Sequence, residues 1–365
     1  MATKVVVSIP GERDYAVRIG AGVLDSLGQN MRAVESLKDV GRALVITDSN
    51  VAPLYLARAK AALSQAGFTT SDITVPAGEE MKSLDAAGEI WRAMAQLGLD
   101  RRCVVVALGG GVVGDLAGFV AATFMRGVPV VQVPTTLLAM VDSSVGGTTA
   151  IDLPEGKNLV GAFHQPSFVC ADTDTLTTLP EREWLSGCGE VAKSAVIDSD
   201  DFFFWHAENA QLLVARDADV VAEAIMRCVV FKANVVAQDK TDVAGMRACL
   251  NYGHTLGHAI EACAGYGTYA HGACVAEGMR FAAKLAACEF DEVGEVMAFA
   301  MAQDELLDAL GLAPLEHSLN PQDLLAAMKR DKKASAGDLR FVLARDVAAW
   351  EIATVPDAHV LECLR

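Results

Sequence analysis

The chain has 365 residues, of which 52% are hydrophobic and 21% charged, and its formal net charge is −17. This composition is typical of a globular protein, and the length is enough for two domains. The acidic balance argues against nucleic acid or an anionic membrane surface as the main partner, although a local cluster of Lys and Arg can still bind a small anion. No apolar run reaches the roughly 18 residues of a transmembrane helix. The nine cysteines contain no C-x-x-C pair, which favours reduced thiols and a cytoplasmic location.

The first half of the chain alternates predicted strands and helices. Each apolar run is followed by a loop with a helix-start signal, a pattern that favours an α/β fold with a doubly wound, Rossmann-like sheet and a ligand crevice at the carboxyl ends of its strands. The strands are expected at Val5–Ile9, Tyr15–Ile19, Ala43–Thr47, Ile73–Val75, Cys103–Leu108 and Val128–Val133, with helices ending at Ala66, spanning Leu84–Leu97 and following Asp115.

From about Pro180 the pattern becomes mainly helical. We therefore expect two domains, 1–178 and 179–365. The helices are expected at Glu181–Ala195, Ala218–Ala237, Leu250–Cys263, Gly272–Cys288 and Val293–Leu310, with a strand at Leu339–Leu343 and a short closing helix.

A glycine-rich turn, Gly109–Asp115, follows a predicted strand and opens a helix. Such a turn lets backbone N–H groups approach a phosphate, but it lacks the G-x-G-x-x-G spacing and is a weak signal for nucleotide binding. Asp48, at the end of an earlier strand, can hold a ribose hydroxyl or cap a helix. The segments 141–152 and 156–161 are rich in small and polar residues, as functional loops often are.

Three of the seven histidines fall in one short window. His254 and His258 are four residues apart and share a helical face, while His271 stands where the next helix begins after a Gly/Tyr-rich turn. Two imidazoles from adjacent helices and a carboxylate from elsewhere would make a catalytic zinc site, and Glu190, three residues before Lys193, is a candidate for that carboxylate. The alternatives are unconnected surface histidines and a surface Glu190–Lys193 ion pair.

Several motifs in order make the chain resemble the 3-dehydroquinate synthase family over nearly its whole length. The likeness implies a homodimer and a C-terminal domain that completes the cleft, and it implies Glu190, His254 and His271 as ligands of Zn²⁺ or Co²⁺. The motifs are Gly109–Asp115, Pro134–Thr136, Asp142–Gly147, Gly156–Asn158, Leu179–Arg182, Glu190 with Lys193, Asn251–His258, His271-Gly272 and Asp331–Lys333.

The resemblance also implies the remaining site residues. NAD⁺ would be held in the N-terminal domain by Asp48, Asn50, Glu79, Lys82, Gly110, Gly111, Val112, Asp115, Thr135, Thr136, Asp142, Lys157, Thr175 and Thr178. The substrate, a seven-carbon sugar-acid phosphate, would contact Asp142, Lys157, Asn158, Lys193, Lys232, Arg247, Asn251, His258, Lys332 and Lys333, with Arg126 reaching across from the partner subunit.

The chemistry that the resemblance implies is transient oxidation of the substrate by NAD⁺, loss of phosphate, reduction and aldol closure, with His258 as the proton shuttle. One departure bears on activity, because Thr148 stands where the family has a lysine. The missing charge-assisted hydrogen bond, roughly 1.5–3 kcal/mol, would weaken binding or turnover ~10–150-fold unless Lys157 or Lys82 compensates.

The alternative functions for the chain are a valiolone- or deoxyinosose-forming cyclase, a polyol dehydrogenase and a non-enzymatic NAD-binding protein.

Overall fold

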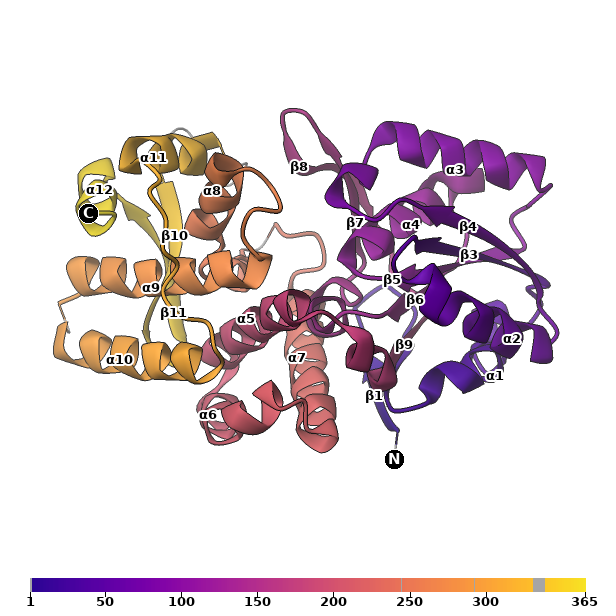
Figure 1. Ribbon diagram of the computed structural model, residues 1–365, viewed down its shortest axis with the longest axis horizontal. Helices are drawn as coiled ribbons and strands as arrows, with labels where there is room; N and C mark the ends of the chain where they lie inside the picture. Colours follow the sequence, from indigo (N-terminus) through magenta and orange to yellow (C-terminus); the bar gives the residue numbers. More distant parts are fainter. Residues whose placement is uncertain (1, 244, 292, 331–338) are drawn as a thin grey trace. The chain divides into compact units, whose positions relative to one another are not determined.

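The computed structural model describes residues 2–243, 245–291, 293–330 and 339–365. They form two compact units (Figure 1). The first unit is Met1–Leu179 with Lys232–Thr241, and the second is Pro180–Phe231 with Asp242–Arg365. The segment Lys232–Thr241 therefore groups with the N-terminal unit. The predicted boundary at residue 178 assigns this segment to the second domain instead.

The first unit is built on a seven-stranded sheet in the order β1-β2-β9-β6-β5-β3-β4. The β1–β2 pair is antiparallel, and all the other pairs are parallel. The carboxyl ends of β6, β5 and β3 are therefore neighbours at one edge of the sheet. The strands are β1 (Thr3–Val7), β2 (Tyr15–Gly20), β3 (Arg42–Asp48), β4 (Thr69–Val75), β5 (Cys103–Gly109), β6 (Val130–Pro134) and β9 (Phe168–Asp172).

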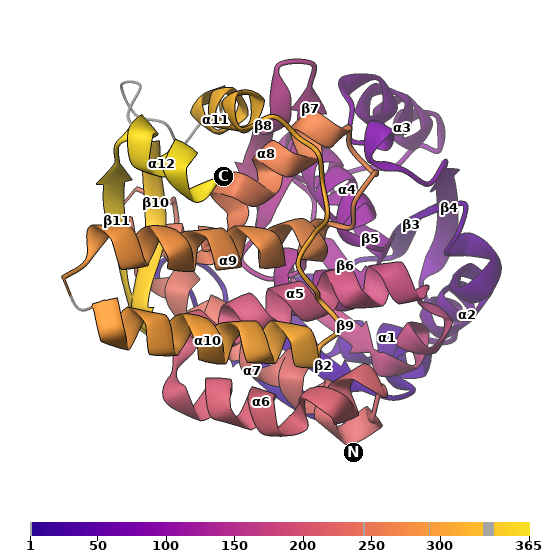
Figure 2. The ribbon, with the colours of Figure 1, turned by 60° about the vertical axis from the view of Figure 1, so that its left-hand side comes forward.

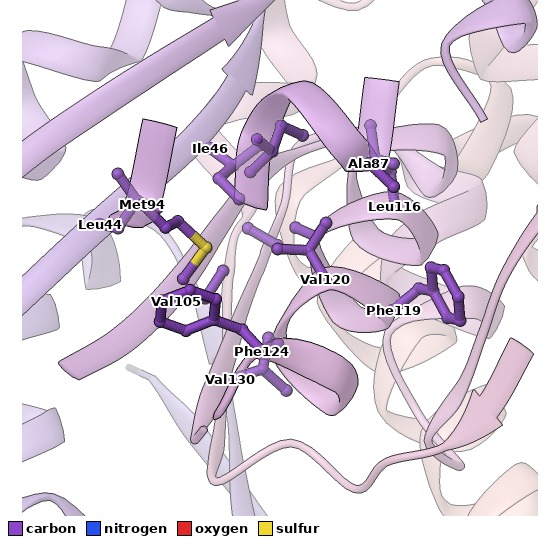
Figure 3. Packing of buried hydrophobic residues seen from close by; sticks show 14 of the residues in the cluster. Leu44, Ile46, Ala87, Met94, Val105, Leu116, Phe119, Val120, Phe124 and Val130 are labelled. Carbon is purple, nitrogen blue, oxygen red and sulfur yellow. The ribbon is translucent and has the colours of Figure 1, made fainter. Parts of the chain in front are cut away.

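Helices cover both faces of this sheet, because alternate residues of each buried strand point to opposite faces. Val105 and Ala107 of β5 pack in one hydrophobic cluster with α3 (Leu84–Gln96) and α4 (Gly111–Thr123), as Figure 3 shows in close-up. Val104 and Val106 belong to the opposite cluster with α1 (Leu27–Arg32) and α2 (Ala57–Gln65). The predicted doubly wound sheet is confirmed.

The segment after β6 contains a hairpin, β7 (Thr148–Leu153) and β8 (Gly156–Phe163), where the sequence predicts loops. That prediction is wrong because a strand pair is specified by backbone pairing across a turn, which a local composition of small residues does not reveal. The short 3₁₀ and π turns of this unit are η1 (Val23–Ser26), η2 (Glu35–Leu37), η3 (Ala52–Leu56), η4 (Glu79–Met81), η5 (Phe124–Arg126), η6 (Ala139–Ser143) and η7 (Thr173–Thr178).

The second unit is mainly helical, as predicted, and α5, α9 and α10 pack against one another (Figure 2). The predicted helix Leu250–Cys263 is wrong at its start, because the turn η8 (Met246–Asn251) and Gly253, with φ +77°, separate Leu250 from α8. The elements are α5 (Glu181–Asp198), α6 (Asp200–Val214), α7 (Ala218–Gln238), α8 (His254–Ala264), α9 (His271–Glu289), α10 (Val293–Ala309), α11 (Pro321–Arg330), β10 (Leu339–Asp346), β11 (Ala349–Val355) and α12 (Asp357–Cys363).

Within the described ranges, no helix combines the length and the hydropathy needed to cross a bilayer.

Candidate functional site

The second unit brings together one carboxylate and two imidazoles from three helices. Glu190 lies in the middle of α5, while His254 and His271 are the first residues of α8 and α9. Glu190 Oε1 lies 3.3 Å from Nε2 of His254 and 3.3 Å from Nε2 of His271. Ligand atoms from all three residues lie within 4.8 Å of one another. These three residues could together hold a metal ion as three protein ligands.

Glycines next to Glu190, His254 and His271 allow their helices to approach this closely. A Cβ on Gly272 would lie 2.1 Å from the carbonyl oxygen of Ser186 in α5, and one on Gly189 would lie 2.5 Å from the carbonyl oxygen of Gly272. Likewise, a Cβ on Gly278 of α9 would lie 1.8 Å from the carbonyl oxygen of Gly253, the residue before α8. Any side chain at these positions would push α5, α8 and α9 apart, and the three ligands with them.

The second ring nitrogen of each histidine has an acceptor that fixes its orientation. His254 Nδ1 lies 3.1 Å from the carbonyl oxygen of Tyr252, and His271 Nδ1 lies 3.3 Å from Glu261 Oε2. Burial lowers the pKa of His254 to about 4, so this imidazole is neutral and its Nε2 is free to ligate. Burial also acts on His271, but the carboxylates of Glu190 and Glu261 outweigh it and raise its pKa to about 10. A bound cation would take the place of that proton.

Glu190 is 2% exposed, and neither of its oxygens makes a hydrogen bond of standard geometry among the described residues. Burial raises its pKa, but the Lys193 ammonium, 2.5 Å from Oε2, and His254 hold the pKa well below the usual carboxyl range. A tetrahedral zinc ion with ligand bonds of about 2.0–2.1 Å separates its ligand atoms by about 3.3 Å. The observed separations and the buried, ionised Glu190 therefore fit a divalent cation.

His258 is the third imidazole of this cluster. Its ring centroid lies 5.3 Å from that of His254 and 6.0 Å from that of His271. His258, Glu261 and His271 also form a second group of possible ligands, so His271 faces a carboxylate through each of its ring nitrogens. Arg247 is buried in η8, and Asn251 ends the same turn.

In the first unit, the carboxyl ends of β3, β5 and β6 carry the predicted cofactor residues. The Asp48 carboxylate accepts hydrogen bonds from the backbone N–H groups of Asn50 and Val51, so it closes a turn after β3. Gly110 and Gly111 lead from β5 into α4, and Val112 lies in its first turn, which leaves backbone N–H groups of the helix free for a ligand.

The same edge fits a nucleotide cofactor in two further respects. A Cβ on Gly110 would lie 3.1 Å from Cγ2 of Thr136, so glycine avoids a tight contact at this turn. The buried hydroxyl of Thr135 has no hydrogen-bond partner within the described part of the chain. An open glycine turn with an unused hydroxyl beside it suits a phosphate or a ribose.

The buried Lys82 is the centre of a polar cluster in the first unit. Its Nζ lies 2.9 Å from Asp115 Oδ2 and 2.5 Å from Asn158 Oδ1. Burial raises the pKa of Asp115 despite the lysine, and the carboxylates around Lys82 raise the pKa of the lysine although burial lowers it. Glu79 links this cluster to Lys157, whose Nζ lies 3.3 Å from Glu79 Oε1.

Asp142 and Lys232 form a second pair in the first unit. Lys232 Nζ donates to both the backbone oxygen and Oδ1 of Asp142, each at 2.8 Å. Lys232 is 5% exposed and lies in the part of α7 that groups with this unit.

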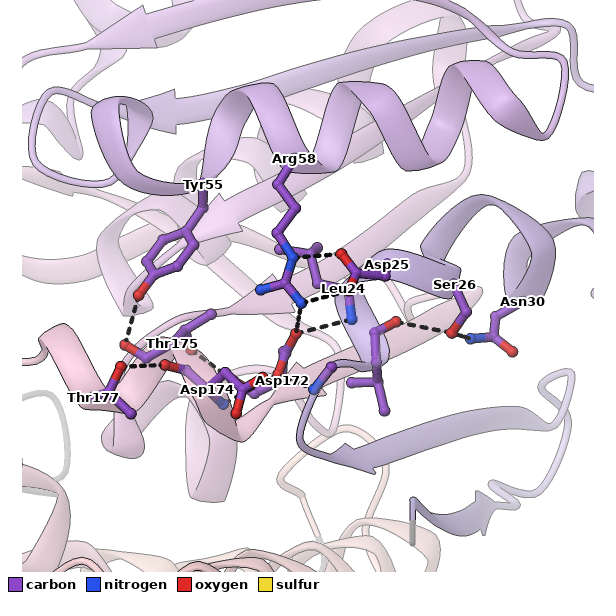
Figure 4. Close-up of polar contacts among 12 residues, drawn as sticks. Leu24, Asp25, Ser26, Asn30, Tyr55, Arg58, Asp172, Asp174, Thr175 and Thr177 are labelled. Atoms are coloured by element: carbon purple, nitrogen blue, oxygen red, sulfur yellow. Dashed lines mark hydrogen bonds and ion pairs between the residues drawn. The ribbon is translucent and has the colours of Figure 1, made fainter.

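Thr175 and Thr178 lie in η7 after β9 and are held by a polar network (Figure 4). The Tyr55 hydroxyl lies 2.6 Å from Thr178 Oγ1 and donates to the carbonyl oxygen of Thr175. The fully buried Asp172 anchors the turn by accepting from the backbone N–H groups of Gly22, Leu24 and Asp174 and by pairing with Arg58 at 3.3 Å (Figure 4).

Two further predicted residues, Arg126 and Thr148, are exposed. Arg126 is exposed and has φ +67°, directly after Met125 with φ +51°. Thr148 is exposed at the start of β7, opposite Phe163 in the hairpin. Lys332 and Lys333 lie outside the described residues.

Comparison with known sequences identifies the family. Residues 72–186 match the N-terminal part of 3-dehydroquinate synthase, and residues 187–334 match its C-terminal part. The chain belongs to the 3-dehydroquinate synthase family. It is 47% identical over 348 residues to the 3-dehydroquinate synthase of Symbiobacterium thermophilum, which covers 95% of each chain.

The fold resembles solved structures of related cyclases. A 2-deoxy-scyllo-inosose synthase complexed with carbaglucose-6-phosphate, NAD⁺ and Co²⁺ is 27% identical, with a TM-score of 0.88 over 100% of this chain and 99% of that one. The 2-epi-5-epi-valiolone synthase of Streptomyces hygroscopicus subsp. jinggangensis, with NAD⁺ and Zn²⁺ bound, is 25% identical, with a TM-score of 0.85 over 98% of each chain.

Two features of the site were not assigned from the sequence. Glu261 follows His254 by seven residues and His258 by three, so the helical spacing could have placed it on the same face. The contact between Gly189 and Gly272 has no such signal, because it depends on two helices distant in sequence meeting in space.

Proposed function

We propose that this chain catalyses the 3-dehydroquinate synthase reaction, which converts 3-deoxy-D-arabino-heptulosonate 7-phosphate to 3-dehydroquinate and phosphate. The observation that carries the proposal is the Glu190–His254–His271 cluster in a member of this family. The overall reaction is redox-neutral, because the substrate is oxidised, loses phosphate, is reduced and closes its ring by an aldol step.

Glu190, His254 and His271 are proposed to hold Zn²⁺ or Co²⁺. Bound there, the cation polarises substrate oxygens and lowers the pKa of the hydroxyl that is oxidised. Glu261 and the carbonyl oxygen of Tyr252 hold the two imidazoles with Nε2 toward Glu190, so the chain sets the ligand directions before a cation arrives.

NAD⁺ is proposed to bind at the edge formed by the ends of β3, β5 and β6, with its phosphates near the N-terminus of α4. Bound there, it supplies a hydride acceptor that is restored in each turnover. Thr135 offers an unused hydroxyl at this edge, and the Tyr55 contact holds the Thr178 side chain in place.

The substrate carries a carboxylate and a phosphate, and the site residues include cations that suit both. Lys193, Lys232 and Arg247 are all buried, which makes their charges effective against an anion in a net-acidic protein. Oxidation of the substrate hydroxyl to a ketone acidifies the neighbouring carbon, and loss of its proton expels phosphate. His258, in the imidazole cluster, can take a proton through one ring nitrogen and return it through the other.

A valiolone- or deoxyinosose-forming activity is not favoured. The solved cyclases of those types are 27% and 25% identical to this chain, whereas the 3-dehydroquinate synthase of Symbiobacterium thermophilum is 47% identical.

The proposal is tested by phosphate release from 3-deoxy-D-arabino-heptulosonate 7-phosphate with NAD⁺ and Zn²⁺, before and after chelation. We expect turnover that EDTA abolishes and Zn²⁺ restores. Thr148→Lys, measured beside the unmodified chain, is expected to increase kcat/KM by ~10–150-fold if no other lysine replaces the family's residue. Phosphate release only from a seven-carbon sugar phosphate without the carboxylate would overturn the assignment in favour of the other cyclases.

We also infer a homodimer in which Arg126 acts in the site of the partner subunit. Supporting this, Arg126 is exposed, and both Arg126 and Met125 have positive φ, a strained geometry that is often found in functional segments. Mixing inactive Arg126→Ala and Glu190→Gln chains under exchange is expected to restore about a quarter of full activity, because half of the dimers are mixed and each has one intact site. No recovery, although mixed dimers are detected by mass, would contradict the inference.

A cytoplasmic location is inferred as well. It is supported by the nine cysteines, all of which carry free thiols.

A further inference from the structure

Two cysteines far apart in sequence meet at the surface of the second unit. Cys288 lies in the last turn of α9, and Cys363 is the last residue of α12. Their sulfur atoms are 3.7 Å apart, although 75 positions separate them in the sequence. Cys288 is exposed and Cys363 partly exposed, whereas six of the other seven cysteines are buried. A small reagent can therefore reach this pair.

The pair is close enough to become a covalent link with a small movement. A disulfide bond is about 2.05 Å long, so the sulfurs must approach by less than 2 Å, a distance on the scale of side-chain rotation. Burial raises the pKa of the Cys363 thiol to about 12, and contact with Cys288 adds to this shift. The exposed Cys288 is accordingly the sulfur that meets an oxidant first, and Cys363 is the one that resolves the mixed disulfide.

We propose that Cys288 and Cys363 form a reversible disulfide that fastens the C-terminal helix α12 to α9 when the chain meets a low-molecular-weight disulfide. The Cys288 thiolate attacks one sulfur of the small disulfide, forms a mixed disulfide and releases one small thiol. The Cys363 thiolate then attacks the Cys288 sulfur and releases the second small thiol. The two protein thiols together lose two electrons and two protons, and the small disulfide gains the two electrons and the two protons as it becomes two thiols.

The cross-link would act on the attachment of α12. In the reduced chain, that helix is held by the buried Val360, by an ion pair between Lys329 and Asp357 and by a contact of 2.5 Å between His359 Nδ1 and Glu289 Oε1. Both polar contacts are at the surface, where such contacts contribute little. A disulfide closes the whole segment from α9 to α12 and disfavours its unfolding by restricting the unfolded chain.

The same geometry predicts what the cross-link leaves unchanged. His271 and Cys288 lie at opposite ends of α9, about 25 Å apart at the rise of an α-helix. Metal affinity and turnover are therefore expected to stay the same in the oxidised chain, while its thermal stability increases.

The test treats the full-length chain with oxidised glutathione, blocks the remaining thiols and identifies linked peptides by mass spectrometry. We expect one internal link, between the peptides of Cys288 and Cys363, a loss of two hydrogens, and a Tm increase of several degrees that dithiothreitol reverses. Cys288→Ser is expected to abolish the link and the Tm increase, whereas the control Cys263→Ser, at the only other partly exposed cysteine, retains both.

Two results would overturn the proposal. One is glutathione that stays attached to Cys288 without resolution by Cys363. The other is a link that forms without raising Tm, which would show that α12 is not fastened by it. Because Cys288 is exposed, loss of folding in Cys288→Ser is not expected, and Cys363→Ser gives an independent second variant in which glutathione should remain on Cys288.

Discussion

The contact between Glu261 and His271 gives a sharp prediction about metal affinity. Glu261 is 7% exposed, and its Oε2 lies 3.3 Å from His271 Nδ1. Its charge makes the imidazole a stronger ligand, and its position directs Nε2 toward Glu190. Glu261→Gln keeps an acceptor for Nδ1–H but removes the charge, whereas Glu261→Ala removes both.

Loss of such a partner typically weakens metal binding 10–100-fold, equivalent to about 1.4–2.7 kcal/mol. We expect about 10-fold weaker Zn²⁺ binding in Glu261→Gln and about 100-fold in Glu261→Ala. The affinity is measured by competition with a chromophoric chelator, with circular dichroism to verify folding. The control is Glu277→Gln on α9, whose carboxylate accepts from the Leu315 backbone N–H. Unchanged affinity in Glu261→Ala, or an equal loss in Glu277→Gln, would refute the reasoning.

Three further predictions concern the parts that support the site. Gly272→Ala should abolish Zn²⁺ binding and lower the unfolding free energy by about 3 kcal/mol, because its Cβ would overlap the Ser186 carbonyl. The control Gly294→Ala has open space around its Cβ and should change the unfolding free energy by less than about 0.5 kcal/mol. Equal changes in the two variants would contradict this prediction. Burial lowers the pKa of His206 to about 4, so this histidine is neutral when folded but protonates below about 6.5 when unfolded. Folding stability is therefore lost as pH falls from about 6.5 to 4. His206→Leu should reduce the loss of unfolding free energy between pH 7 and pH 5 by about 2 kcal/mol, measured by urea titration at each pH. An unchanged loss in this variant would contradict the prediction. Asp172→Ala leaves three backbone N–H groups without their acceptor and removes one of the two carboxylates that pair with Arg58, so it should cost about 3–5 kcal/mol in the same assay. The exposed Asp174→Ala should cost less than about 0.5 kcal/mol, and similar losses would show that the network of Figure 4 is not stabilising.

The sheet was predictable because its central strands are continuous apolar runs, which indicate buried strands from the local sequence alone. The run Cys103–Leu108 corresponds to β5, and its alternate residues fill the clusters on both faces. The strand Phe168–Asp172 was not predicted, since five residues carry little periodicity, and its place between β2 and β6 depends on tertiary pairing. The hairpin β7–β8 was missed because a composition of small and polar residues does not reveal backbone pairing across a turn.

The cluster of Glu190, His254 and His271 could be predicted only in part from the sequence. The prediction that a helix begins at His271 is confirmed, and the spacing of His254 and His258 does place their rings in contact on α8. The sequence could not show that Glu190 and Lys193 are both 2% exposed, because that burial comes from packing of α5 against other helices. A helix position gives the face of a residue, but only the fold decides what covers that face.

The measurement that tests the central claim most directly follows product formation with limiting NAD⁺ and saturating Zn²⁺. The proposed reaction restores its cofactor in each turnover, so many equivalents of 3-dehydroquinate and phosphate should form per NAD⁺, with no accumulation of NADH. Glu190→Gln should eliminate both products. Accumulation of NADH in proportion to the substrate consumed, without phosphate, would instead indicate a dehydrogenase and contradict the account.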